Sequence, residues 1–485
     1  MAIRKRKDVL KLSTWDPALV WYAKAIADMQ SRGFVDSSSW RYQAAIHDYD
    51  PQNDPLDVPT DPPPPIAEQD RFWRRCQHAS WFFLPWHRMY LAYFEQIVAT
   101  TVASLGGPAD WALPYWNYSD AGNPDARKLP PAFIAPTLPD GSPNALMVAN
   151  RLRGNDGKDV ASNLHVDLSV CLAEPDFEGN PGGGIPGFGG PRTAFHHPGT
   201  GFPIGSLEAT PHGSMHVRVG GWMGRFNTAG LDPVFWLHHC NIDRLWEVWR
   251  KRDARRQDPS AAAWTTNVTF DFHDASGQVV SLRPSQVVST TAAPLFYEYE
   301  DISDPLGAQH PSMESARVRG MADRPIPEMV GATEAPHTLA GGSTTIRFTA
   351  TPPTGPASRA ESVDAPRRIV LNIENVTAPR QTTGYEVYLN LPAGSDPVER
   401  QDHLAGHLSM FGVDSHSTPD DKHSGDGLHY ALDVTRVVRV LESRNAWSPR
   451  DISVTFVPED VPPSDRESAA EKVPVQVGRI SLYMA

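Results

Sequence analysis

The apolar residues of this chain change their spacing partway along, which divides it into two kinds of structure. Between Leu19 and Met29 they recur every three or four residues, the spacing of a helix with one buried face. In segment 369–373, and in similar segments up to the C-terminus, they alternate with polar residues, the pattern of half-buried strands. We therefore predict a mainly α domain at 1–300, a linker at 301–345 and an all-β, sandwich-like domain at 346–485.

The composition excludes several classes of function. Asp and Glu number 57 against 44 Lys and Arg, so the net charge is −13, the wrong sign for binding nucleic acid through its phosphates. Three cysteines are too few for a disulfide framework. No apolar run is as long as a membrane span, and the N-terminus lacks the apolar core of a secretion signal. We expect no nucleic-acid or membrane partner, and a cytoplasmic location.

Histidine spacing carries the chemical signal. In PHGSMH, His212 and His216 lie four residues apart, so one helical face can direct both imidazoles at a single ion. The segment is not the H-E-x-x-H motif of zinc peptidases, because Gly213 occupies the place of the glutamate. Downstream, LDPVFWLHHCNIDRLW contains His239, and Asp243 follows it by one helical turn, where a carboxylate can support the imidazole.

A second histidine group lies earlier in the chain, in CQHASWFFLPWHRMYLAYFE. His78 and His87 are nine residues apart, which is half a turn out of phase on one straight helix. They can share a metal only if the chain breaks between them, and Pro85 offers that break. His47, near the end of another expected helix, is the natural third member of the group.

The ligand chemistry narrows the choice of metal. Each group offers three imidazoles and no carboxylate, which argues against magnesium, calcium or a carboxylate-bridged iron pair. Imidazole ligands suit copper or zinc. Zinc hydrolases with paired metals generally add bridging carboxylates, so the residues favour two coppers over zinc.

These motifs resemble those of the type 3 copper proteins, the family of tyrosinases, catechol oxidases, polyphenol oxidases and haemocyanins. ALPYWNYSD at 112–120 and the Y-x-Y of Tyr297 and Tyr299 match as well, and the resemblance covers about residues 4–300. It implies two copper ions in a four-helix bundle, with O₂ as co-substrate and His238 as a non-ligand. One copper is assigned to His47, His78 and His87, and the other to His212, His216 and His239.

The resemblance also assigns roles to single residues. Glu208 matches a glutamate that holds an active-site water in plant relatives, although an ordinary acid at a helix start is an equal alternative. Phe226 matches a bulky gate residue over one copper, or is a plain core residue. Gly213 stands where efficient tyrosinases carry an asparagine that helps the glutamate. Cys76 precedes His78 at the spacing of the family's thioether crosslink; the alternative is a buried free thiol.

The C-terminal segment resembles, more loosely, the β-domain that covers the active site in haemocyanin units and in latent plant and fungal enzymes. Within HLSMFG, Met410 and Phe411 are candidates for a side chain that plugs the entrance.

The implied reaction is the copper-dependent oxidation of o-diphenols (catechols) by O₂ to o-quinones, so the partner is a small phenolic substrate. Weak ortho-hydroxylation of monophenols is also expected. Two alternatives remain open: an o-aminophenol oxidase, and a haemocyanin-like protein that binds dioxygen without turnover. Carriers normally come as repeated units, and the single unit in this chain favours the enzyme.

Overall fold

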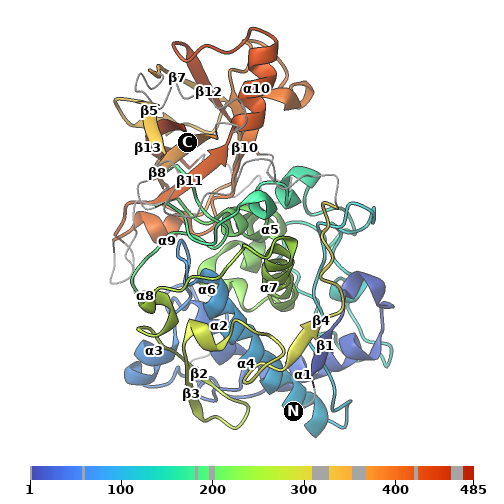
Figure 1. Cartoon of the computed structure of the whole chain (residues 1–485). Coiled ribbons are helices and arrows are strands. Elements are labelled where there is room, and N and C mark those ends of the chain that lie inside the picture. Colours follow the sequence, from blue (N-terminus) through green and yellow to red (C-terminus); the bar gives the residue numbers. More distant parts are fainter. Residues whose placement is uncertain are drawn as a thin grey trace. The chain divides into compact units, whose positions relative to one another are not determined.

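The computed structural model describes residues 3–56, 60–180, 184–195, 203–307, 327–351, 368–419, 424–459 and 473–484. The chain divides into two compact units, each described by itself below. The helical unit comprises Met1–Asp167 and Met215–Pro305, and the β unit comprises Leu168–Ser214 and Leu306–Ala485. Figure 1 labels most of the elements of both units.

The first unit is mainly helical, as the sequence predicts. Its helices are α1 (Pro17–Gln30), α2 (Trp40–His47), α3 (Ile66–Phe72), α4 (Phe83–Ser104), α5 (Ser214–Val219, whose first residue belongs to the β unit), α6 (Phe226–Ala229), α7 (Pro233–Arg252) and α8 (Ala262–Thr265). Two small ribbons join them: β1 (Arg4–Arg6) pairs in parallel with β4 (Tyr297–Tyr299), and β2 (Phe270–His273) pairs antiparallel with β3 (Val279–Leu282). Among the described residues, no helix is both long and apolar enough to span a membrane.

Local sequence explains where the main helices begin. The side chains of Asp16, Ser39 and Asp232 accept backbone N–H bonds in the first turns of α1, α2 and α7. Pro17 and Pro233 occupy the first helical positions of α1 and α7, where no partner for a backbone N–H is lost.

The sequence predicts a chain break at Pro85 between His78 and His87. In the structure, the break lies earlier in the chain. Helix α3 ends at Phe72, and α4 begins at Phe83, so His78 lies on the non-helical segment between them. Pro85 lies inside the first turn of α4, where backbone N–H groups need no helical partner. The proline therefore starts a helix instead of separating two.

Aromatic packing holds together the helices that carry the histidines. Helix α4 packs against α1 and α7. Phe94 of α4 stacks on Trp236 of α7 with the ring planes 8° apart. Trp40 of α2 lies against both rings, with centroid distances of 5.9 and 6.2 Å. These buried contacts fix the mutual positions of α2, α4 and α7.

The second unit is rich in sheet, which confirms the all-β prediction for its C-terminal part. Its strands form two antiparallel sheets with the orders β10-β9-β12-β7 and β11-β8-β13-β5, and β6 also pairs with β13. The strands are β5 (Glu328–Ala332), β6 (His337–Leu339), β7 (Thr344–Phe348), β8 (Ile369–Thr377), β9 (Tyr385–Leu389), β10 (Leu404–Leu408), β11 (Leu428–Asp433), β12 (Ile452–Pro458) and β13 (Val475–Met484). Two helices accompany them, α9 (Val413–Ser417) and α10 (Thr435–Ser443).

The boundary of the β unit differs from the expected one. The predicted linker at 301–345 contains β5 and β6, both of which pair with β13 at the end of the chain. The β unit also takes in 168–214, which the sequence assigns to the α domain. The partners of these segments are far away in sequence, so local patterns carry no sign of them.

Two contacts tie segment 168–214 to the sheets. The carboxylate of Glu174, 1% exposed, accepts two bonds from the Arg368 guanidinium, which also binds Asp433 at 2.8 Å. The N–H of Ile204 donates to the carbonyl oxygen of His429 at 2.9 Å. Segment 168–214 is therefore an integral part of the β unit.

Candidate metal centre

Three histidines of the first group meet in the interior of the helical unit. His47 ends α2, His87 lies in α4, and His78 lies on the segment that precedes α4. Their ring centroids are 5.3 Å apart for His47 and His78, 5.3 Å for His78 and His87, and 5.8 Å for His47 and His87. All three side chains are buried. The structure thus brings together the three residues that the resemblance assigns to one metal.

Backbone carbonyls orient two of these imidazoles. Nδ1 of His47 lies 2.9 Å from the carbonyl oxygen of Phe226, and Nδ1 of His87 lies 2.8 Å from that of Phe83. A neutral imidazole that donates through Nδ1 keeps Nε2 as its lone-pair donor for a metal. The arrangement therefore fixes the tautomer that metal binding needs.

The second group meets the first at His239. Nε2 of His239 in α7 lies 3.2 Å from Nε2 of His216 in α5, and Nδ1 of His216 donates to the carbonyl oxygen of Met223 at 2.7 Å. The ring of His239 also stacks on that of His87, with centroids 4.5 Å apart and planes 11° apart. This geometry fits two adjacent metal positions.

His238 is close to the second group but differs in orientation. Its centroid is 4.8 Å from that of His216, and its ring stacks on Tyr118 at 5.6 Å. One metal-binding nitrogen from each of His216, His238 and His239 lies within 4.8 Å of the others. His239 is the better ligand candidate, because its ring also contacts the first group.

His212 belongs to the part of the chain that clusters with the β unit. It lies in the π-helical turn Glu208–Gly213, which continues directly into α5, so His212 precedes His216 by one turn on the same face. Its Nδ1 lies 3.2 Å from the carbonyl oxygen of Glu208. Within the β unit, the ring of Phe411 stands edge-on to His212 with centroids 5.6 Å apart.

Burial keeps the imidazoles of the site in the neutral form that can bind a metal cation. Burial lowers the pKa of His47 to about 4 and that of His238 to about 3, and it lowers the pKa of His87 and His216 well below the usual 6.5. These imidazoles are neutral near pH 7, the form that binds a metal. In the part of the chain that the structure describes, the candidate metal groups contain no carboxylate. The donor set thus fits copper or zinc.

Cys76 and Phe226 flank the first group. The sulfur of Cys76 lies within 4.8 Å of ring nitrogens of both His47 and His78. Phe226 stacks on His78, with centroids 4.4 Å apart and planes 14° apart. The expected gate residue therefore lies against a residue of the metal group.

Glu208 and Gly213 lie at the two ends of the turn that carries His212. Glu208 is buried, and its negative charge helps to raise the pKa of the Tyr430 phenol, which burial raises most. A β-carbon on Gly213 would stand 2.5 Å from Oγ of Ser409, so a side chain at this position needs Ser409 to move.

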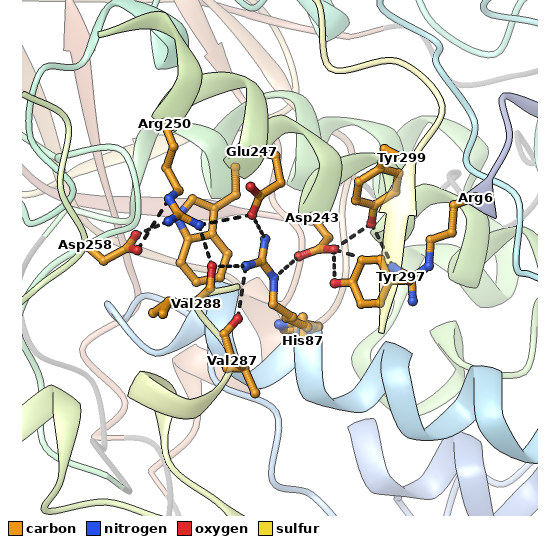
Figure 2. A network of polar contacts seen from close by, with 12 residues as sticks. Arg6, His87, Asp243, Glu247, Arg250, Asp258, Val287, Val288, Tyr297 and Tyr299 are labelled. Carbon is orange, nitrogen blue, oxygen red and sulfur yellow. Dashed lines mark hydrogen bonds and ion pairs between the residues drawn. The ribbon is translucent and has the colours of Figure 1, made fainter. Parts of the chain in front are cut away.

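Asp243 does not support the His239 imidazole, as the sequence suggests, but binds other side chains. Among the described residues its carboxylate binds Arg88, Arg6, Tyr297 and Tyr299, and not His239. Figure 2 shows Tyr297 and Tyr299 converging on Asp243. Burial alone would raise the pKa of Asp243, but the two guanidinium groups and the two phenols hold it below its ordinary value. Because Arg88 directly follows His87, Asp243 connects α7 to the ligand helix α4.

Sequence reasoning missed the carbonyl acceptors at Phe83, Met223 and Phe226. Every residue has a carbonyl group, so no motif can mark the ones that meet an imidazole. It also missed Ser409, which lies next to Gly213 in the β unit. The two residues are almost 200 positions apart in the sequence, so no local pattern marks their proximity.

Comparison with known proteins finds matches to both parts of the chain. A family model described as "Common central domain of tyrosinase" matches residues 37–252, and one described as "Domain of unknown function (DUF7868)" matches residues 326–485. The chain is 35% identical to "Tyrosinase HcTyr1" of Hahella sp. (strain CCB-MM4), over 99% of each chain. It is 28% identical to "Polyphenol oxidase, chloroplastic" of Malus domestica, over 66% of this chain and 56% of the apple protein.

Solved structures with a similar fold cover both units. Latent apple tyrosinase aligns with a TM-score of 0.61 and 22% identity, over 100% of this chain and 98% of the other. A latent aurone synthase aligns with a TM-score of 0.63 and 20% identity, over 100% of this chain and 89% of the other. The family model and the sequence relatives identify an oxidoreductase of the tyrosinase and polyphenol oxidase class. The chain belongs to the tyrosinase family.

Proposed function

We propose that this protein is a dicopper oxidase that converts catechols and O₂ to o-quinones and water. The observation that carries the proposal is the meeting of the two histidine groups at His239, which faces His216 and stacks on His87. Metal ions held by these groups would be neighbours, as a reaction of two metals with one O₂ requires.

The ligand assignment follows from the groups. His47, His78 and His87 would hold one copper, and His212, His216 and His239 would hold the other. When bound, the pair supplies redox chemistry: it passes electrons from catechol to O₂, so that two catechols and one O₂ give two o-quinones and two waters.

The surrounding side chains orient the substrate and take up protons. Phe226 provides an apolar wall beside His78, against which a flat aromatic ring can pack. The buried carboxylate of Glu208, four residues before His212, is suited to hold a water that accepts a phenolic proton. Gly213 adds no polar atom to that water, so proton removal from a monophenol is less assisted, and catechols are the preferred substrates.

Two features of the family complete the proposal. Cys76 and His78 form a thioether, supported by the proximity of the Cys76 sulfur to the His78 ring. The C-terminal β-domain limits access to the site, supported by the edge-on contact of Phe411 with His212 inside the β unit.

A substrate panel on the copper-loaded protein tests the proposal. The panel contains a catechol, the matched monophenol and the matched o-aminophenol, with copper content measured on the same sample. We expect two coppers per chain and the highest kcat/KM for the catechol. Higher turnover of the o-aminophenol would replace the substrate assignment, and dioxygen binding without any turnover would identify a carrier.

A further inference from the structure

One segment of the β unit runs along the turn that carries His212. Alternate residues of His407–Phe411 contact it: His407, Ser409 and Phe411. The intervening Leu408 and Met410 are fully buried. Strand β10 ends at Leu408, and Met410 has a left-handed backbone with φ 60°, so the contacts come from the end of the strand and from the turn that follows it.

His407 makes the polar contacts at one end. Its Nε2 is hydrogen-bonded to Oγ of Ser214 and lies 3.3 Å from Oγ1 of Thr210. Thr210 has extended backbone angles inside the helical turn, with φ −145° and ψ 124°. The imidazole therefore bridges the two sides of an irregular turn, with His212 between them in sequence.

Ser409 makes the closest approach, at Gly213. A β-carbon on Gly213 would stand 2.5 Å from Oγ and 3.2 Å from Cβ of Ser409. Rotation of the Ser409 hydroxyl would relieve only part of this overlap, because Cβ of Ser409 does not move when the side chain rotates. The absence of a side chain at residue 213 is what permits this contact.

We propose that His407 and Ser409 are positioning residues for His212, the one proposed copper ligand that belongs to the same unit. The inference rests on the proposed function, because it assigns His212 to a copper. It also explains why residue 213 is a glycine: a side chain there would meet Ser409. This explanation is separate from the effect of Gly213 on monophenols. It also agrees with the grouping of 168–214 with the β unit, held by the buried pair of Glu174 and Arg368.

The test compares Gly213→Ala, Ser409→Gly and the double variant in the full-length protein. Copper affinity is measured by equilibrium competition with a chelator, which resolves the first and the second ion. Alanine is the better helix former, so a purely local effect of Gly213→Ala would strengthen the helix. We expect Gly213→Ala instead to weaken the second copper by about tenfold or more and to leave the first unchanged. The double variant should recover the affinity of Ser409→Gly.

A second pair of variants covers the case in which Gly213→Ala does not fold. His407→Gln keeps a polar partner for Ser214, and His407→Leu removes it. In the metal-free protein, His407→Leu should speed amide hydrogen exchange at 208–214, and His407→Gln should do so much less. Phe411→Ala is the contrasting variant: a covering role predicts a higher kcat/KM for catechol with unchanged affinity for both coppers.

Wild-type affinity for the second copper in Gly213→Ala would overturn the inference, as would a double variant that binds this copper more weakly than Ser409→Gly does. Unchanged hydrogen exchange in His407→Leu would also overturn it. These readouts do not use turnover, so a wild-type protein that binds both coppers but leaves catechol unoxidised would refute the oxidase proposal alone.

Discussion

The Nε2 atoms of His216 and His239 face each other at 3.2 Å, and His238, next in the chain to His239, lies outside this pairing and against Tyr118. His239→Ala should therefore lose one copper and all catechol oxidation, because a single copper cannot supply a two-metal reaction. His238→Ala should keep both ions. Copper per chain, measured after removal of free metal, checks this. Loss in His238→Ala with retention in His239→Ala would reverse the assignment.

The proposed crosslink changes the mass of one peptide. Joining the Cys76 sulfur to an imidazole carbon of His78 would remove two hydrogen atoms, as two protons and two electrons that O₂ takes up to give hydrogen peroxide, once the protein is loaded with copper. The peptide spanning both residues should therefore be lighter by two hydrogens, and its sulfur should resist alkylation in the denatured protein. Protein kept free of copper provides the control, with a thiol that alkylates fully. A fully alkylated Cys76 in the loaded enzyme would contradict the crosslink.

Substrate preference depends on residue 213. We expect the wild type to favour catechols strongly, because a phenol of pKa ~10 needs help to lose its proton near neutral pH. Gly213→Asn alone would press on Ser409, so the informative variant combines it with Ser409→Gly. The combined variant should raise the ratio of monophenol to catechol kcat/KM by about tenfold or more. Ser409→Gly is the matched control. An unchanged ratio would show that another group governs proton removal.

Buried histidines make the metal-free protein sensitive to acid. The folded pKa of His47 is about 4, whereas an unfolded imidazole titrates near 6.5. Between these values the unfolded chain binds more protons, so the unfolding free energy falls as the pH falls from about 6.5 to about 4. His47 alone contributes a loss on the order of 3 kcal/mol, and His87 and His216 act in the same direction.

Denaturant unfolding of the metal-free protein across this pH range measures the effect. His47→Gln should remove its share of the pH dependence. A free energy that stays constant from about pH 7 to pH 4 would contradict the burial of neutral imidazoles.

The sequence could predict which histidines come together, because spacing on a helix is a local property. His212 and His216 share a face by their four-residue separation alone, and the chain break between His78 and His87 follows from their nine-residue separation. The predicted position of that break, at Pro85, is wrong, because a proline is tolerated in the first turn of a helix as readily as after its end.

Long-range contacts explain the remaining differences. The pairing of β5 with β13 and the ion pair of Glu174 with Arg368 set the boundary of the β unit, and neither leaves a local pattern. Asp243 follows His239 by one turn, but the competing charges of Arg6 and Arg88 come from other elements and take its carboxylate.

Oxygen uptake during catechol oxidation tests the central claim most directly. The measurement compares the O₂ consumed with the o-quinone formed, in copper-loaded protein and in the same protein stripped of copper. We predict two coppers per chain and one O₂ consumed for every two o-quinones formed. Stripping the copper should abolish O₂ uptake, and adding copper back should restore it. A loaded protein that binds O₂ reversibly but forms no quinone, or a stripped protein that keeps its activity, would contradict the account.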